Sequence, residues 1–159
     1  MQSESPDPGL EHPDHLDASW AGRDDAWAVI GAGPHGLAAT KALLQRGQQV
    51  DCFERSSEIG GNWNFDGETS RVYESTHLIS TKPFTQFPDF PMPDSFPDYP
   101  SHRQVLAYFR SYADHFGLRD HIALDTEVTR VTPLAGDRWQ VTSRHRPTGE
   151  LQSRVYAGV

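Results

Sequence analysis

Three glycines with the spacing Gly-x-Gly-x-x-Gly, Gly31, Gly33 and Gly36, directly follow the apolar run 27–30. In this pattern the first glycine permits a tight turn, the second lets backbone approach a pyrophosphate, and the third allows a helix to pack closely on a strand. Glu54 follows at roughly the separation of about 20 residues at which a carboxylate can accept both hydroxyls of a ribose. The pattern predicts a dinucleotide site, and the negative charge of Glu54 favours FAD or NAD over NADP.

The elements that must position these residues are visible in the flanking sequence. The run 27–30 predicts a buried strand, and Pro34 suits the first position of a helix, where no N–H is needed. Good helix formers fill 37–44, with Gly47 as a C-terminal cap. Residues 49–53 predict a second strand. We therefore expect a Rossmann-like β-α-β unit.

The second half of the chain predicts a helix followed by β structure. Ser101 and Gln104 form a capping box at the start of a helix over 101–117, whose aromatic stripe is typical of a core. Three segments with partial alternation follow, at 122–131, 138–144 and 150–159, separated by the turn sequences 133–137 and 146–149. They predict a strand followed by a β-hairpin.

Composition and charge limit the classes of function. Residues 1–25 are acidic and proline-containing without apolar periodicity, which predicts a disordered leader and not a secretory signal. The net charge is −8 and no basic stripe is present, so we expect no nucleic-acid partner. No run is apolar enough for a membrane span. The scattered histidines predict no metal site. Cys52 is the single cysteine, interpreted as a core residue, and favours a reducing compartment such as the cytoplasm.

Two further segments carry unusual residues. Gly60 and Gly61 form a second glycine pair soon after Glu54, and Trp63 could cover a large flat ligand there. The alternative is an ordinary turn with a buried aromatic. Residues 83–100 interleave prolines with aromatic residues, which suits either a ligand for an aromatic groove of a partner or a rigid loop packed on the protein body. We favour the packed loop.

Taken together, these motifs resemble the flavin-containing monooxygenase family, in order and in spacing, from residue 26 to 159. The resemblance implies a bound FAD and an incomplete doubly wound α/β flavoprotein fold. It rests on Val-Ile-Gly-Ala-Gly-Pro-His-Gly-Leu (29–37), Cys-Phe-Glu-Arg-Ser (52–56), Ile-Gly-Gly-Asn-Trp (59–63), Tyr-Glu-Ser (73–75), Phe-Pro-Asp-Phe-Pro-Met-Pro (87–93) and the helix around 106–110.

The same resemblance assigns roles to individual residues. Glu54 would hold the ribose, and Asn62 with Trp63 would approach the flavin side. The backbone of Val128 would meet the adenine edge. The residues that would line the pyrophosphate are Gly31, Ala32, Gly33, Pro34 and His35. The further candidates for contact with the cofactor are Gly36, Arg55, Gly61 and Ser80.

The activity that the resemblance implies is oxygen transfer. NADPH reduces the flavin, and one atom of O2 passes to a nitrogen or sulfur of a small-molecule substrate. One position departs from the family pattern: Ile79 stands where members usually carry an asparagine, and isoleucine cannot donate a hydrogen bond.

The sequence holds a single glycine fingerprint, so the domain for NADPH is expected to be absent. We interpret the chain as an N-terminal part of an FAD-binding domain that would be inactive alone. Two other interpretations of the function stay open. One is a Baeyer–Villiger-type or other two-dinucleotide flavoprotein oxidoreductase, and the other is a truncated FAD-binding remnant without turnover.

Overall fold

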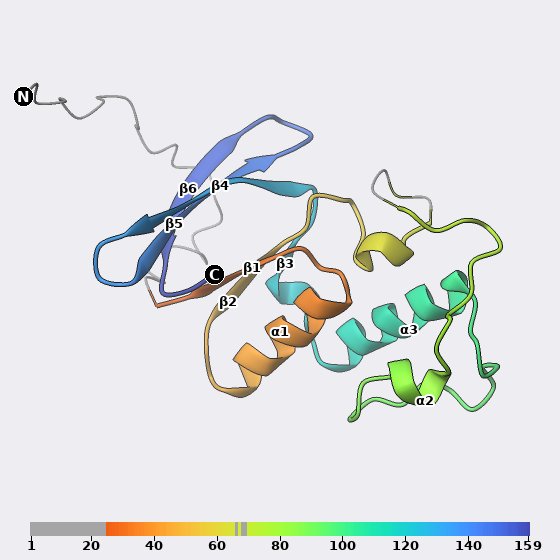
Figure 1. Ribbon diagram of the computed structural model, residues 1–159. Coiled ribbons are helices and arrows are strands. Elements are labelled where there is room, and N and C mark those ends of the chain that lie inside the picture. Colours follow the sequence, from red (N-terminus) through yellow and green to blue (C-terminus); the bar gives the residue numbers. More distant parts are fainter. Residues whose placement is uncertain (1–24, 66, 68–69) are drawn as a thin grey trace, which may run out of the picture.

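The computed structural model describes residues 25–65, 67 and 70–159, so the acidic leader predicted over 1–25 lies outside the described residues apart from its last position. Two sheets and several helices make up this part of the chain (Figure 1). The parallel sheet has the order β1 (Trp27–Ile30), β2 (Val50–Phe53), β3 (Ile122–Ala123), and the antiparallel sheet has the order β4 (Thr126–Leu134), β5 (Arg138–His145), β6 (Leu151–Tyr156). The helices are α1 (Pro34–Gln45), α2 (Lys82–Thr85) and α3 (His102–His115), with 3₁₀ turns η2 (Gly61–Trp63) and η3 (Arg119–His121).

Strand β2 lies between two layers and is buried along its whole length. Val50 and Cys52 belong to the larger apolar core with the helices, whereas Phe53 belongs to a second core shared with the antiparallel sheet. This alternation follows from the two-residue period of a strand. Figure 1 accordingly shows the parallel strands between α1 on one side and the antiparallel sheet on the other.

The predicted strand–turn–helix unit is confirmed. Helix α1 begins at Pro34, with Gly33 as its N-cap. Gly47 has a φ of +75°, and its N–H donates to the carbonyl of Leu44 (2.9 Å), while Gln48 N–H donates to that of Leu43 (3.1 Å). These two bonds form the capping pattern in which a left-handed glycine ends a helix. The start and the end of α1 were both readable from sequence.

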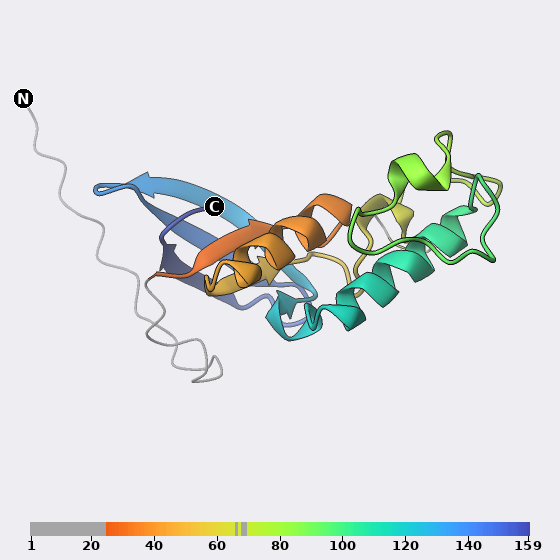
Figure 2. The same ribbon diagram turned by 90° about the horizontal axis from the view of Figure 1, so that it is seen from below.

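Helix α3 carries most of the aromatic core and begins as predicted. The Ser101 side chain accepts from the Gln104 backbone, and the Gln104 side chain accepts from the Ser101 N–H, so the capping box is present. The rings of Tyr108 and Tyr112 are buried and contact the proline-rich segment. Figure 2 shows this segment and α2 gathered beside α3, away from the antiparallel sheet.

The segment 83–100 packs on the protein body through part of its aromatic set. The Phe87 ring lies 4.2 Å from that of Tyr112, and the Phe90 ring lies 5.6 Å from it, measured between centroids. The Lys82 side chain also stabilises this segment. Its ammonium donates to three backbone carbonyls, those of Pro93, Asp94 and Phe96, at 3.2, 3.3 and 3.0 Å. Phe84, in contrast, is 90% exposed, so the favoured packed-loop interpretation holds for some rings and not for all.

The prediction of a single strand over 122–131 was wrong. Ile122–Ala123 pair with β2 in the parallel sheet, whereas the chain from Thr126 onward enters the antiparallel sheet. Asp125 turns the corner with a φ of +52°, a conformation that aspartate tolerates better than most residues. The expected hairpin is thereby part of a three-stranded meander.

The turn predicted over 133–137 begins later than expected. Pro133 and Leu134 remain in β4, opposite Trp139 and Arg138. Because β4 pairs on one side only within the described sheet, a proline without an N–H is tolerated at its free edge.

The C-terminal segment lies alongside β1. The Ala28 N–H donates to the Gly158 carbonyl (2.9 Å), and the Ala157 N–H donates to the Ala26 carbonyl (2.8 Å). A Cβ on Gly158 would come within 2.3 Å of the Trp27 ring, so the close approach requires glycine there. Strand β6 ends at Tyr156 and not at 159, because the chain leaves the meander to reach β1.

Among the described residues, no helix combines the length and the apolar character that crossing a bilayer demands.

Candidate functional site

A cavity of about 420 Å³ lies where the parallel sheet and the antiparallel sheet meet. It is at the carboxyl ends of β1 and β2, the edge at which open α/β sheets bind ligands. Its wall combines two glycine segments, two strand ends and the start of β4. The lining residues are Ile30, Gly31, Gly33, Phe53, Glu54, Arg55, Gly61, Asn62, Thr126, Glu127 and Val128.

The first glycine segment forms a tight turn between β1 and α1. Gly31 has a φ of +92°, and its N–H donates to the Phe53 carbonyl at 2.7 Å. A Cβ on Gly36 would lie 1.7 Å from the Gly31 carbonyl oxygen, so α1 can pack this closely only because residue 36 has no side chain. The N-terminus of α1 is thereby held beside the cavity, which its N-cap Gly33 lines, and a helix N-terminus can attract an anion.

The second glycine segment packs directly on the first. The Gly60 N–H donates to the Ala32 carbonyl (2.9 Å), and a Cβ on Gly61 would lie 3.2 Å from the Gly33 Cα. Backbone from both segments thus forms one wall that no side chain covers at residues 33 and 61. This wall suits the close approach of a pyrophosphate and of the adjoining part of a dinucleotide.

Glu54 connects the glycine-rich turn to the segment after β2. It is 5% exposed, and its Oε2 accepts from the Ala32 N–H (2.8 Å) while its Oε1 accepts from the Ser56 N–H (2.9 Å). A carboxylate offers about four lone-pair sites, so each oxygen retains one for a ligand hydroxyl. Glu54 therefore orders the cavity wall and can still accept hydrogen bonds from a ribose.

Strand β4 supplies a further part of the cavity wall. Glu127 is paired with Arg144, with 2.6 Å between Oε2 and Nη2, and this hydrogen bond is the main reason that the pKa of Glu127 is lowered. Val128 follows it and packs in part against the smaller core. The cavity lining thus contains two acidic side chains, Glu54 and Glu127.

Seven of the residues singled out in the sequence line the cavity, and six do not. The lining set is Gly31, Gly33, Glu54, Arg55, Gly61, Asn62 and Val128. The residues outside it are Ala32, Pro34, His35, Gly36, Trp63 and Ser80.

Several residues outside the lining support it indirectly. Ala32 bonds to Glu54 through its N–H, and Gly36 admits the helix. Ser80 instead hydrogen-bonds Thr85 at 2.6 Å between hydroxyl oxygens, and its neighbour Ile79 is 99% exposed. Neither residue is part of the cavity lining.

Sequence reasoning missed four of the lining residues: Ile30, Phe53, Thr126 and Glu127. Ile30 and Phe53 end the two parallel strands, and the rule that ligands bind at the carboxyl ends of such strands could have identified them. Thr126 and Glu127 immediately precede Val128, but placing the start of β4 required the corner at Asp125.

Cys52 is a core residue and not a reactive thiol. It is fully buried, and burial is the main cause that raises its pKa from the ordinary 9.0 to about 12. We expect a thiol-specific reagent at pH 8 to label native protein negligibly and to label it fully after unfolding in urea. Between pH 9 and 12 the folded state holds the thiol proton more firmly than the unfolded state, so the free energy of unfolding falls as pH rises through this range. Rapid labelling without denaturant would contradict the burial.

Several known proteins are similar to this chain in sequence. A family model described as flavin-binding monooxygenase-like matches residues 25–159. Flavin-containing monooxygenase 5 of Oryctolagus cuniculus is 39% identical over 140 residues, which cover 83% of this chain and 26% of the relative. The chain therefore spans about a quarter of the length of the curated relatives it matches.

Solved structures extend the likeness to three dimensions. S-allyl-L-cysteine S-oxygenase from Allium sativum overlaps with a TM-score of 0.77 at 25% identity, over 83% of this chain and 34% of that one. A steroid monooxygenase bound to NADP overlaps with a TM-score of 0.66 at 27% identity, over 80% of this chain and 24% of that one. By sequence and by fold, the chain belongs to the flavin-binding monooxygenase-like family.

Proposed function

We propose that this chain is the FAD-binding portion of an NADPH-dependent monooxygenase that transfers one oxygen atom from O2 to a nitrogen or sulfur of a small molecule. The observation that carries the proposal is the cavity at which the two glycine segments meet beside Glu54. The likeness to an S-oxygenase with a TM-score of 0.77 supports a soft nucleophile as substrate. The likeness to a steroid monooxygenase bound to NADP supports the nicotinamide cofactor.

Individual residues would hold FAD through different groups. Backbone N–H groups of Gly33, His35 and Gly36, at the N-terminus of α1, would meet the pyrophosphate. Glu54 would accept from the ribose hydroxyls, and the backbone of Val128 would meet the adenine. Asn62 and Trp63 would lie toward the flavin.

FAD supplies the redox chemistry, and the protein residues bind and orient it. The apolar side chains of Ile30 and Phe53 would exclude water from one side of the cofactor. The sequence contains one glycine fingerprint, so we assign NADPH to a second dinucleotide unit outside this sequence. This segment would then turn over substrate only when joined to that unit.

Titration of the purified chain with FAD tests the proposal. We expect quenching or polarisation of the flavin fluorescence to saturate with one FAD per chain. A chain that is folded by circular dichroism but leaves FAD free would overturn the proposal. Oxygen transfer is tested in a protein in which this segment is joined to a nicotinamide-binding unit, by NADPH oxidation that a tertiary amine or a sulfide stimulates.

The substitution Glu54→Gln is expected to weaken FAD binding by about 1–3 kcal/mol, because hydrogen bonds to a charged acceptor are lost. The amide also loses one of the two acceptors that hold the N–H groups of Ala32 and Ser56. The matched control is Glu127→Gln in the same cavity lining, where we expect a smaller loss since Glu127 is already paired with Arg144. A folded Glu54→Gln variant that binds FAD as tightly as the wild type would refute the ribose assignment.

A further inference from the structure

The segment 58–63, which we call the Gly60–Gly61 loop, is packed between the glycine-rich turn and α3. On one side Gly60 bonds to the Ala32 carbonyl, and Gly61 contacts Gly33. On the other side a Cβ on Gly60 would lie 2.4 Å from Leu106 Cδ1 of α3. Because Gly61 and Asn62 line the cavity, the distance of this loop from α3 decides where one cavity wall stands.

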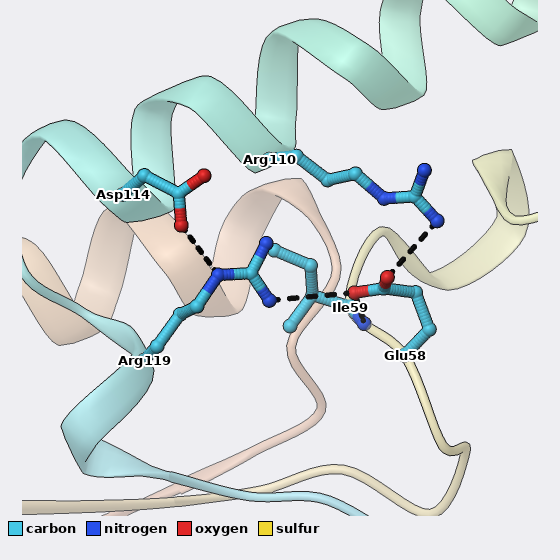
Figure 3. Close-up of polar contacts among 5 residues, drawn as sticks. All are labelled: Glu58, Ile59, Arg110, Asp114 and Arg119. Atoms are coloured by element: carbon cyan, nitrogen blue, oxygen red, sulfur yellow. Dashed lines mark hydrogen bonds and ion pairs between the residues drawn. The ribbon is translucent and has the colours of Figure 1, made fainter.

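Ion pairs of Glu58, at the start of the Gly60–Gly61 loop, connect the loop to α3 (Figure 3). Glu58 Oε2 lies 2.9 Å from Arg110 Nη2 of α3, and Glu58 Oε1 accepts from the Ile59 N–H at 2.9 Å. Arg119 adds a weaker contact, with 3.6 Å from its Nη1 to Glu58 Oε1, and its Nε donates to Asp114 of α3. One carboxylate thus connects the first peptide of the loop to α3 and to the residue that begins η3.

The residues of this ion-pair network lie outside the cavity lining. Glu58, Arg110 and Arg119 do not line the cavity. Ile59, the residue between Glu58 and the glycine pair, is 1% exposed and belongs to the larger core. Glu58 therefore acts on the cavity only through the backbone that follows it.

We infer that Glu58 is a positioning residue that fixes the Gly60–Gly61 loop against α3 in the geometry that FAD requires. The inference rests on the proposed function, because the ligand of the positioned wall is FAD. The contact with Arg110 joins the loop to the helix, and the contact with the Ile59 N–H fixes the first turn of the loop. A neutral side chain of the same shape would leave the core intact and let the loop shift.

The test is FAD affinity in a double-mutant cycle of Glu58→Gln and Arg110→Met. We expect Glu58→Gln to raise the Kd for FAD roughly tenfold, the loss of about one hydrogen bond to a charged group, and Arg110→Met to raise it by less. The double variant should bind no more weakly than Glu58→Gln alone, because both substitutions remove the same contact. The matched control is Glu74→Gln, which removes a more exposed ion pair with Arg103 at the other end of α3 and should leave the Kd unchanged.

A second ligand distinguishes positioning from general loss of structure. Adenosine lacks the phosphates and the flavin, so we expect Glu58→Gln to change its affinity less than twofold in an NMR titration, whereas damage to the whole cavity would weaken adenosine and FAD alike. Unchanged FAD affinity in a folded Glu58→Gln variant, or equal losses for both ligands, would overturn the inference and leave the proposed function standing. If Glu58→Gln fails to fold, the same two affinities are measured for Arg110→Met. A loss of FAD affinity without an equal loss for the smaller ligand then supports the inference, and any other result overturns it. Failure of the wild-type chain to bind FAD would overturn the proposed function itself.

Discussion

Replacement of Gly36 by alanine is expected to destabilise the fold by about 3 kcal/mol or more, at the upper end of overpacking costs. The new methyl group would lie 1.7 Å from the Gly31 carbonyl oxygen, which is backbone and cannot rotate away. Helix α1 must then move off β1, and the N–H groups at its start leave the cavity. Urea unfolding followed by circular dichroism should show the loss, and FAD titration should show no binding.

The matched control is Gly33→Ala in the same turn. Gly33 has an ordinary φ of −74° as the N-cap, and its nearest neighbour would lie 3.8 Å from an added Cβ, so the fold should tolerate the change. The methyl group would nevertheless enter the cavity and obstruct a pyrophosphate. We therefore expect Gly33→Ala to retain stability and lose FAD affinity. A Gly36→Ala variant as stable as Gly33→Ala would contradict the close packing of α1 on β1.

The second large effect is expected at the buried pair that joins the two sheets. Asp51 of β2 is 1% exposed, and its Oδ2 lies 2.8 Å from Arg154 Nη1 and 3.0 Å from the Tyr156 hydroxyl, both on β6. Asp51→Ala would remove the carboxylate partner of the Arg154 guanidinium, whose side chain is only 14% exposed, and breaking a buried pair in this way typically costs about 3–5 kcal/mol. The free energy of unfolding at pH 7, measured in urea, checks this value.

The variant Asp51→Leu with Arg154→Met and Tyr156→Phe serves as the control for charge. It removes both charges together with the hydroxyl that donates to Asp51, and fills the space with apolar atoms. Such replacements of a buried pair are often neutral or stabilising, so we expect this variant to recover most of the stability that Asp51→Ala loses. Equal stability of Asp51→Ala and the wild type would show that the pair does not hold the sheets together.

The sequence predicted those parts of the fold that local chemistry determines. Pro34 and Gly47 bound α1, and Ser101 and Gln104 start α3, because each of these devices acts within a few residues. The division of residues 122–131 between two sheets could not be predicted from the sequence. It depends on contacts with Glu54, whose carbonyl accepts from the Thr126 N–H (2.8 Å) and whose N–H donates to the Ala123 carbonyl (2.9 Å).

The candidate site shows the same limit. The glycines and Glu54 were identifiable because their types and spacing encode the turn and the acceptor. Glu127 was not, since its place on the cavity wall follows from how β4 crosses the parallel sheet. The contact of Glu58 with Arg110 likewise depends on packing between elements far apart in sequence.

The pairing of β1 with Gly158 has a consequence for how the chain folds. Trp27 and Gly158 stand opposite each other in parallel register although nearly the whole described chain separates them. Closing such a long loop costs entropy before the contact stabilises anything, and long-range parallel pairing is slow for this reason. During synthesis, β1 and β2 can pair with α1 between them long before Gly158 leaves the ribosome. The outer edge of β1 is therefore covered later than the edge that pairs with β2, and until then it can pair with strands of other chains.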